Sequence, residues 1–160
     1  MEYDDLVKED FDAVVTGELT HYALWLEDEL NRIIMSYFKV PKARREDFKR
    51  LILLRDGLTF QDKLEIVRGM LPLFGDIAVS TNLKQLLKEL EEFKSSRNAM
   101  AHGQDVSDDD DEAKLKISIT TRSGKERVIE ITPESHTKLM DRAEALLKDL
   151  KAARAALKGV

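Results

Sequence analysis

Apolar side chains recur every three to four residues over most of the chain, a period typical of helices with one buried face. The first and longest stripe includes Phe11, Tyr22 and Trp25, which are expected to form core or a dimer surface. Gly17 is its weak point, because glycine disfavours the helical conformation. The pattern predicts helices over residues 5–38, 44–55, 59–74, 80–102 and 133–158.

Capping residues mark several of these helix ends. Thr59 with Asp62 three residues later predicts a capping box at the start of the third helix. Ser80 or Thr81 is the expected N-cap of the fourth helix. Thr132-Pro133 predicts the start of the last one, since proline is tolerated in the first helical position. In the second helix, the expected buried residues are Phe48, Leu51, Ile52 and Leu54.

The period changes in residues 114–131, where apolar and polar side chains alternate. Leu115, Ile117 and Ile119 fall on one side of the first run, as in a half-buried strand. A turn at 122–125 separates this run from a second β-rich one. The segment predicts a β-hairpin, which is marginal alone and must pack on other elements.

These elements predict a mainly α fold: a helical bundle of four to five helices with the hairpin inserted before the C-terminal helix. We expect residues 1–160 to form a single domain, with an acidic loop at 104–113 and the hairpin at 114–131. Like charges repel over residues 104–112, and none of these residues is expected to be buried.

Composition narrows the functional classes. Apolar residues make up 42% of the 160 residues and charged residues 36%, as in a soluble globular protein. The absence of cysteine excludes disulfides and thiolate metal sites and favours a cytoplasmic location. No apolar run approaches the roughly 20 residues of a membrane span, so no membrane partner is expected. A net charge of −5 argues against a general binder of duplex DNA.

The candidate functional side chains cluster at the predicted C-terminal end of the fourth helix. Asn98 and His102 are four residues apart and share a helical face, and the long side chain of Arg97 can reach the same face. His102 falls in the last turn, where the helix dipole favours its charged form. Gly103 is expected to end the helix in the left-handed conformation. An arginine beside a titratable histidine suits a phosphate or another anion.

The other two histidines are not expected to belong to a functional site. His21, inside the first helix, is expected to be a partly buried structural residue. His136, in the first turn of the last helix, is expected to be exposed. No histidines and carboxylates have metal-ligand spacing, and the run Asp108–Asp111 lacks the glycine of a calcium loop. We therefore expect neither a metal nor a cofactor.

The run from Ser96 to Gly103 resembles the signature of the HEPN superfamily, in which an arginine and a polar residue precede a histidine near a helix end. Four residues separate Arg97 from His102, and Asn98 is the polar residue. The capped helix start at Leu58–Leu64 is also similar to that of many members, which include proteins like the mannitol operon repressor. The resemblance implies an all-α bundle.

Many HEPN proteins are metal-independent endoribonucleases, often toxins or defence effectors, that act as homodimers with two motifs in one cleft. The resemblance implies that this chain cleaves single-stranded RNA and is neutralised by an antitoxin or regulated by a protein partner. His102 is then the general acid or base, Arg97 binds the scissile phosphate, and Asn98 positions one or the other. Such chemistry needs proton transfer near neutral pH and a fixed cation.

Three other interpretations stay open. Arg97, Asn98 and His102 can serve structure alone, by bonding to backbone at helix ends. The chain can be a non-catalytic protein-interaction or transcription-regulatory module similar to mannitol operon repressors. A third interpretation is a pocket for an anionic small molecule around Arg97 and His102. The acidic loop after the motif either only solubilises the chain or repels RNA and mimics an anion at the site.

Overall fold

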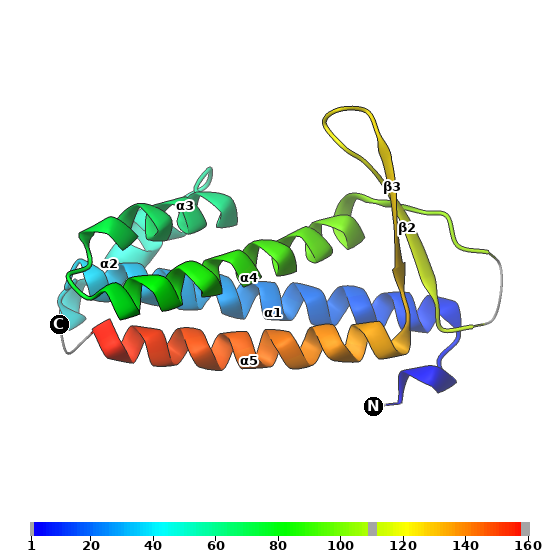
Figure 1. The fold of residues 1–160 in the computed structure, drawn as a ribbon, viewed down its shortest axis with the longest axis horizontal. Helices are drawn as coiled ribbons and strands as arrows, with labels where there is room; N and C mark the ends of the chain where they lie inside the picture. The colour runs from blue at the N-terminus through cyan, green and yellow to red at the C-terminus, as the bar shows by residue number, and fades with distance from the viewer. Residues whose placement is uncertain (1, 109–111, 158–160) are drawn as a thin grey trace. The chain divides into compact units, whose positions relative to one another are not determined.

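A computed structural model describes residues 2–108 and 112–157 of the chain. The prediction of a mainly α fold with a hairpin before the last helix is confirmed (Figure 1). The α-helices are α1 (Lys8–Tyr37), α2 (Arg45–Phe48), α3 (Phe60–Met70), α4 (Ile77–His102) and α5 (Pro133–Leu157). The strands are β1 (Gln104–Asp105), β2 (Leu115–Thr120) and β3 (Glu126–Ile131). No helix in the described ranges has the length and apolar character needed to cross a membrane.

The chain divides into two compact units. The sheet unit comprises Met1–Ala23 and Glu91–Glu144, and the helical unit comprises Leu24–Leu90 and Ala145–Val160. The candidate site lies entirely within the sheet unit. That residues 1–160 form a single domain stays a prediction.

The sheet unit contains the first part of α1, the last part of α4, the first part of α5 and all three strands. Figure 1 shows the hairpin of β2 and β3 beside the C-terminal end of α4 and joined to the start of α5. Its buried apolar side chains include Phe11, Val15, Leu19, Phe93, Ala99, Leu115, Ile117, Met140 and Ala143. The hairpin is thus stabilised by burial against helices, which an isolated hairpin lacks.

The sheet is antiparallel with strand order β1-β2-β3. In β1, Gln104 pairs with Ser118 and Asp105 pairs with Ile117. The predicted acidic loop at 104–113 is therefore wrong at its start, because backbone pairing to β2 gives these polar residues a strand conformation. Residues 109–111 of that loop lie outside the described residues.

The segment predicted as the second helix, residues 44–55, departs from its prediction. Residues Lys49–Leu53 form a π-helical turn after the short α2, so the side chains no longer follow the 3.6-residue period. Leu53 is buried, whereas Leu51, Ile52 and Leu54 are exposed. The predicted apolar face was therefore wrong, because the wider turn displaces it by a residue.

Two of the three predicted caps are confirmed. The Thr59 hydroxyl accepts from the backbone N–H of Asp62 at 3.2 Å, and the Asp62 carboxylate accepts from the backbone N–H of Thr59 at 2.7 Å. Thr132 Oγ1 accepts from the backbone N–H of Ser135 at 3.2 Å at the start of α5. The third cap was wrong: α4 begins at Ile77, because the Asp76 carboxylate accepts from the backbone N–H of Ala78.

The histidine environments are the reverse of those predicted. His21 is exposed, and His136 is only 1% exposed. His136 Nε2 lies 2.6 Å from Glu18 Oε2, and the Tyr3 hydroxyl donates to the same carboxylate oxygen at 2.9 Å. His136 lies four residues before buried Met140, on the inward stripe of α5. Its second ring nitrogen, Nδ1, is buried without a hydrogen-bond partner in the described structure.

The apolar stripe of α1 was also predicted only in part. Phe11 is fully buried in the core of the sheet unit, as predicted. Trp25 is 52% exposed, so its place in the core was wrong, although its alternative place on a dimer surface stays a prediction. The helix α1 continues through Gly17 without a break. Periodicity identified the helix but not the exact width of its buried face.

Candidate functional site

Asn98 and His102 lie in the last turns of α4 and share a face, as their spacing predicts. Asn98 is half-buried and His102 is exposed. Within residues 2–108 and 112–157, the imidazole of His102 has no hydrogen bond or ion pair with another side chain. Both ring nitrogens are therefore open to a ligand and to proton exchange with it.

Arg97 is placed differently from its two neighbours. Its guanidinium donates through Nη1 to Oδ1 of Asn98 at 3.0 Å. This bond occupies an acceptor site of the Asn98 amide and leaves the Nδ2 group to donate elsewhere. The structure thus brings Asn98 and His102 to one surface, with Arg97 orienting the amide from the side.

An open groove of about 860 Å³ lies along this face of α4. The helix contributes Glu92, Ser95, Ser96, Asn98, Ala99 and His102 to its lining. The hairpin contributes Ile119, Thr120, Thr121, Arg122, Arg127 and Ile129. Arg97 is not among the lining residues. The groove is of a size that takes a small organic ligand or a short piece of a polymer.

The register of the hairpin explains which of its residues reach the groove. Ile117 pairs with Ile129 and Ile119 pairs with Arg127. Because side chains alternate across a strand, these four residues share one face of the sheet. That face is buried at Ile117, half-buried at Ile119 and Ile129, and exposed at Arg127. The apolar face therefore ends in a cation where the sheet borders the groove.

Arg122 and Arg127 were not identified from the sequence as site residues. A signal was present, since the alternation that places Ile119 inward also places Arg127 inward once the strands are paired. The pairing register itself depends on the turn geometry, which alternation alone does not supply. The sequence also offered no means of placing the hairpin beside the end of α4.

The charge of the groove is positive. Glu92 is its lining carboxylate, and Glu92 Oε2 accepts from Nη2 of Arg142 at 3.2 Å. No carboxylate in the described part of the chain forms an ion pair with Arg122 or Arg127. Two unneutralised guanidinium groups therefore face a groove whose acid is already paired, which favours an anionic ligand.

At Gly103 the C-terminal end of α4 approaches the strand β2 closely. Its φ is not positive, since Gly57 and Gly124 are the described glycines in that region, so the predicted left-handed conformation is wrong. A Cβ at Gly103 would lie 2.5 Å from the carbonyl oxygen of Ala99 and closer still to Cγ2 of Ile117. Glycine is needed here because α4 ends directly against β2.

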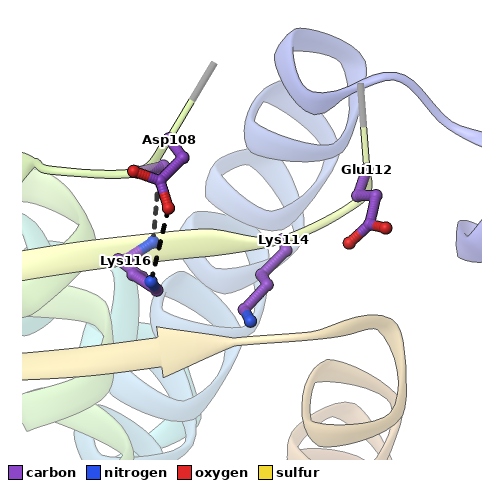
Figure 2. Close-up of a pocket in the computed structure, with 5 residues that line it drawn as sticks. Asp108, Glu112, Lys114 and Lys116 are labelled. Carbon is purple, nitrogen blue, oxygen red and sulfur yellow. Dashed lines mark hydrogen bonds and ion pairs between the residues drawn. The ribbon is translucent and has the colours of Figure 1, made fainter. Parts of the chain in front are cut away.

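The described part of the acidic loop lies against other cations. Asp105 Oδ2 is 3.2 Å from Nζ of Lys8, and Asp108 Oδ2 is 3.7 Å from Nζ of Lys116 (Figure 2). Lys116 alternates with Ile117, so it points away from the groove-lining face of the sheet. These described carboxylates therefore do not neutralise Arg122 or Arg127.

A second, small pocket lies beside this loop. It is lined by Ser107, Asp108, Glu112, Lys114 and Lys116. Figure 2 shows the carboxylates and lysines around the same space, and their charges offset one another. Among the residues that the structure describes, no group of three or more His, Cys, Asp or Glu side chains is arranged to hold a metal ion.

Comparisons with models of protein families, with curated proteins and with solved structures found no match to this chain.

Proposed function

We propose that this protein is a HEPN-type, metal-independent endoribonuclease that cleaves single-stranded RNA in the groove beside His102. The observation that supports this most is the placement of an exposed imidazole and the Asn98 amide in a groove with net positive charge. Single-stranded RNA fits such a groove because its backbone carries one phosphate per nucleotide and its bases are free to turn aside.

The proposed reaction is transesterification followed by release. The ribose 2′-oxygen attacks the adjacent phosphorus and loses its proton to a base, while the bond from phosphorus to the 5′-oxygen breaks. The departing 5′-oxygen takes a proton from an acid, which leaves a 2′,3′-cyclic phosphate and a 5′-hydroxyl. His102 transfers one of these protons, and such a residue contributes roughly 10²–10⁴-fold to the rate.

A second proton-transfer group is required at the other oxygen. His102 is the single histidine among the described residues that line the groove, so we propose that a second copy of the chain supplies its own His102 across a homodimer. In this arrangement Arg97 acts through Asn98, whose amide donates to a phosphate oxygen or to the attacking group. An antitoxin or regulatory protein partner would act by covering the groove.

The test is cleavage of a single-stranded RNA in the presence of a chelator, by wild type and by His102→Ala and Asn98→Ala. We expect His102→Ala to lose at least about 10²-fold in rate. His21→Ala is the matched control, because His21 is an exposed histidine of the same unit outside the groove lining. Equal rates for wild type and His102→Ala, or no cleavage by wild type, would contradict the proposal.

A non-catalytic protein-interaction module is the second candidate. The bond from Arg97 to Asn98 favours it, because this guanidinium is then engaged within the chain rather than with a ligand. The cleavage assay separates the two candidates directly. A module of this kind would bind a protein partner through the same groove and leave RNA intact.

A further inference from the structure

We infer that Arg122 and Arg127 of the hairpin form the phosphate-binding wall of the groove and hold the backbone of a single-stranded nucleic acid against α4. The inference rests on the proposed function for its choice of ligand. It assigns anion binding to residues outside the helical motif, which then supplies proton transfer and orientation.

The position of Arg127 is the first support. It occupies the inward face of β3, which it shares with Ile129 and Ile131 nearer the core. An arginine at this place can lay its aliphatic stem along the apolar face while its guanidinium stays in water. The charged end is thereby directed along the groove rather than away from it.

Arg122 is held by an ordered turn rather than by a loose loop. The backbone N–H of Thr121 donates to the Lys125 carbonyl at 2.8 Å, and that of Gly124 donates to the Thr121 carbonyl at 2.9 Å. Gly124 takes a positive φ of 80°, which glycine adopts without strain. These bonds restrain the turn that presents Arg122 at the edge of the groove.

Hydroxyl groups that line the groove can also donate hydrogen bonds to an anion. Ser95 supplies a hydroxyl from the α4 wall and Thr120 supplies one from the hairpin wall. The Ser96 hydroxyl already donates to the Glu92 carbonyl at 3.3 Å, and Thr121 Oγ1 lies 2.9 Å from Ser123 Oγ. Hydroxyls and guanidinium groups together are the usual protein donors to phosphate oxygens. A strand of nucleic acid lying along the groove would therefore meet donors on both sides and His102 on the α4 side.

Salt dependence separates these arginines from their neighbours. For a single-stranded ligand, the slope of log affinity against log salt becomes shallower by about 0.7 for each phosphate that the protein no longer neutralises. Lys125 is the matched control, because it is a cation of the same turn that does not line the groove. A general attraction to the hairpin would depend on Lys125 as much as on the arginines.

The experiment measures binding of a fluorescent single-stranded oligonucleotide by anisotropy, at several NaCl concentrations from about 50 to 200 mM. Its 2′-deoxy form keeps the phosphates but lacks the attacking hydroxyl, so cleavage does not interfere. We expect Arg127→Gln and Arg122→Gln each to make the slope shallower by about 0.7, Arg127→Lys to retain it, and Lys125→Gln to leave it unchanged. Circular dichroism confirms that each variant is folded.

The outcomes separate this inference from the proposed function. Slopes and affinities of Arg127→Gln and Arg122→Gln equal to wild type would overturn the inference, even if wild type cleaves RNA. A wild type that does not bind the oligonucleotide would overturn it as well. Binding with the expected slopes but without cleavage of the RNA form would support the inference and contradict the proposed nuclease.

Discussion

The close approach of Gly103 to the sheet yields the sharpest stability prediction. Gly103→Ala adds one methyl group where the nearest atoms are the Ala99 carbonyl oxygen at 2.5 Å, the Ser118 carbonyl oxygen at 3.2 Å and, closer still, Cγ2 of Ile117. Two of these atoms belong to backbone. The third belongs to a β-branched side chain that is 4% exposed and has little rotamer freedom.

The magnitude follows from these neighbours. None of them can yield by a simple rotation, so the end of α4 and β2 must separate, and the backbone at residue 103 must also turn away from the Ala99 carbonyl within α4. Forced overpacking of this kind costs about 1–3 kcal/mol. Replacing glycine by alanine also returns about 0.4–1 kcal/mol by restricting the unfolded chain. Because the contact to Cγ2 of Ile117 is so close, the upper part of the overpacking range, about 2–3 kcal/mol, applies. We expect a net loss of about 1–2.6 kcal/mol in the free energy of unfolding.

Gly17→Ala is the matched control. A Cβ at Gly17 meets nothing within 4 Å, and the residue lies inside α1 of the same unit. The same chemical change should here stabilise the protein by about 0.5–1 kcal/mol, because alanine favours helix over glycine.

Urea unfolding followed by far-ultraviolet circular dichroism measures both variants. We expect the two midpoints to move in opposite directions from that of wild type, while the slope of free energy against urea stays constant. A Gly103→Ala variant at least as stable as wild type would refute the close approach of α4 to β2. Relocation of the sheet would also reduce the proposed RNA cleavage in this variant, without any change to His102.

The pKa of Tyr3 is raised to about 12, chiefly by burial and then by the hydrogen bond to Glu18 and the negative charge of the Glu18 carboxylate. The folded state then keeps the phenolic proton longer than the unfolded chain, so this contribution to stability is complete below about pH 10 and is lost as the pH rises toward about 12; Tyr3→Phe should flatten the decline in unfolding free energy over that range, and an unchanged decline would contradict it. Glu18→Ala should lower the free energy of unfolding by about 1–3 kcal/mol, since it leaves the buried ring of His136 without a partner; a melting temperature equal to that of wild type would argue against this. Thr59→Ala removes one half of the capping box with Asp62 and should cost about 1 kcal/mol, measured by urea unfolding; an unchanged urea midpoint would count against the cap.

The sequence predicted those parts of the fold that depend on local pattern. The long helices, the hairpin and the caps at Thr59 and Thr132 follow from periodicity and hydrogen-bonding groups within a few residues of each other. The π-helical turn at Lys49–Leu53 could not be predicted from local pattern. Helical periodicity assumes 3.6 residues per turn, and a π-helical turn is wider. The strand β1 did not follow from local pattern either, because Gln104 and Asp105 are two polar residues that carry no strand pattern of their own.

The site was predictable in its helical half only. Four-residue spacing places Asn98 and His102 on one face, and the structure puts both in the groove. Arg127 reaches the groove through cross-strand register and the packing of the hairpin, which are long-range properties. The hydrogen-bond partner of His136, Glu18, is likewise 118 residues away in the sequence.

The pairing of Ile119 with Arg127 has a further consequence for how this groove can change. A shift of one residue in the register would turn Arg127 and Ile129 outward and bring Glu126 and Val128 toward α4 instead. The groove would then gain a carboxylate in place of a guanidinium, with no substitution in either strand. Turn length in this hairpin therefore helps to determine the charge of the groove, and adding or removing one turn residue is a direct route to a groove in which Glu126 offsets Arg122.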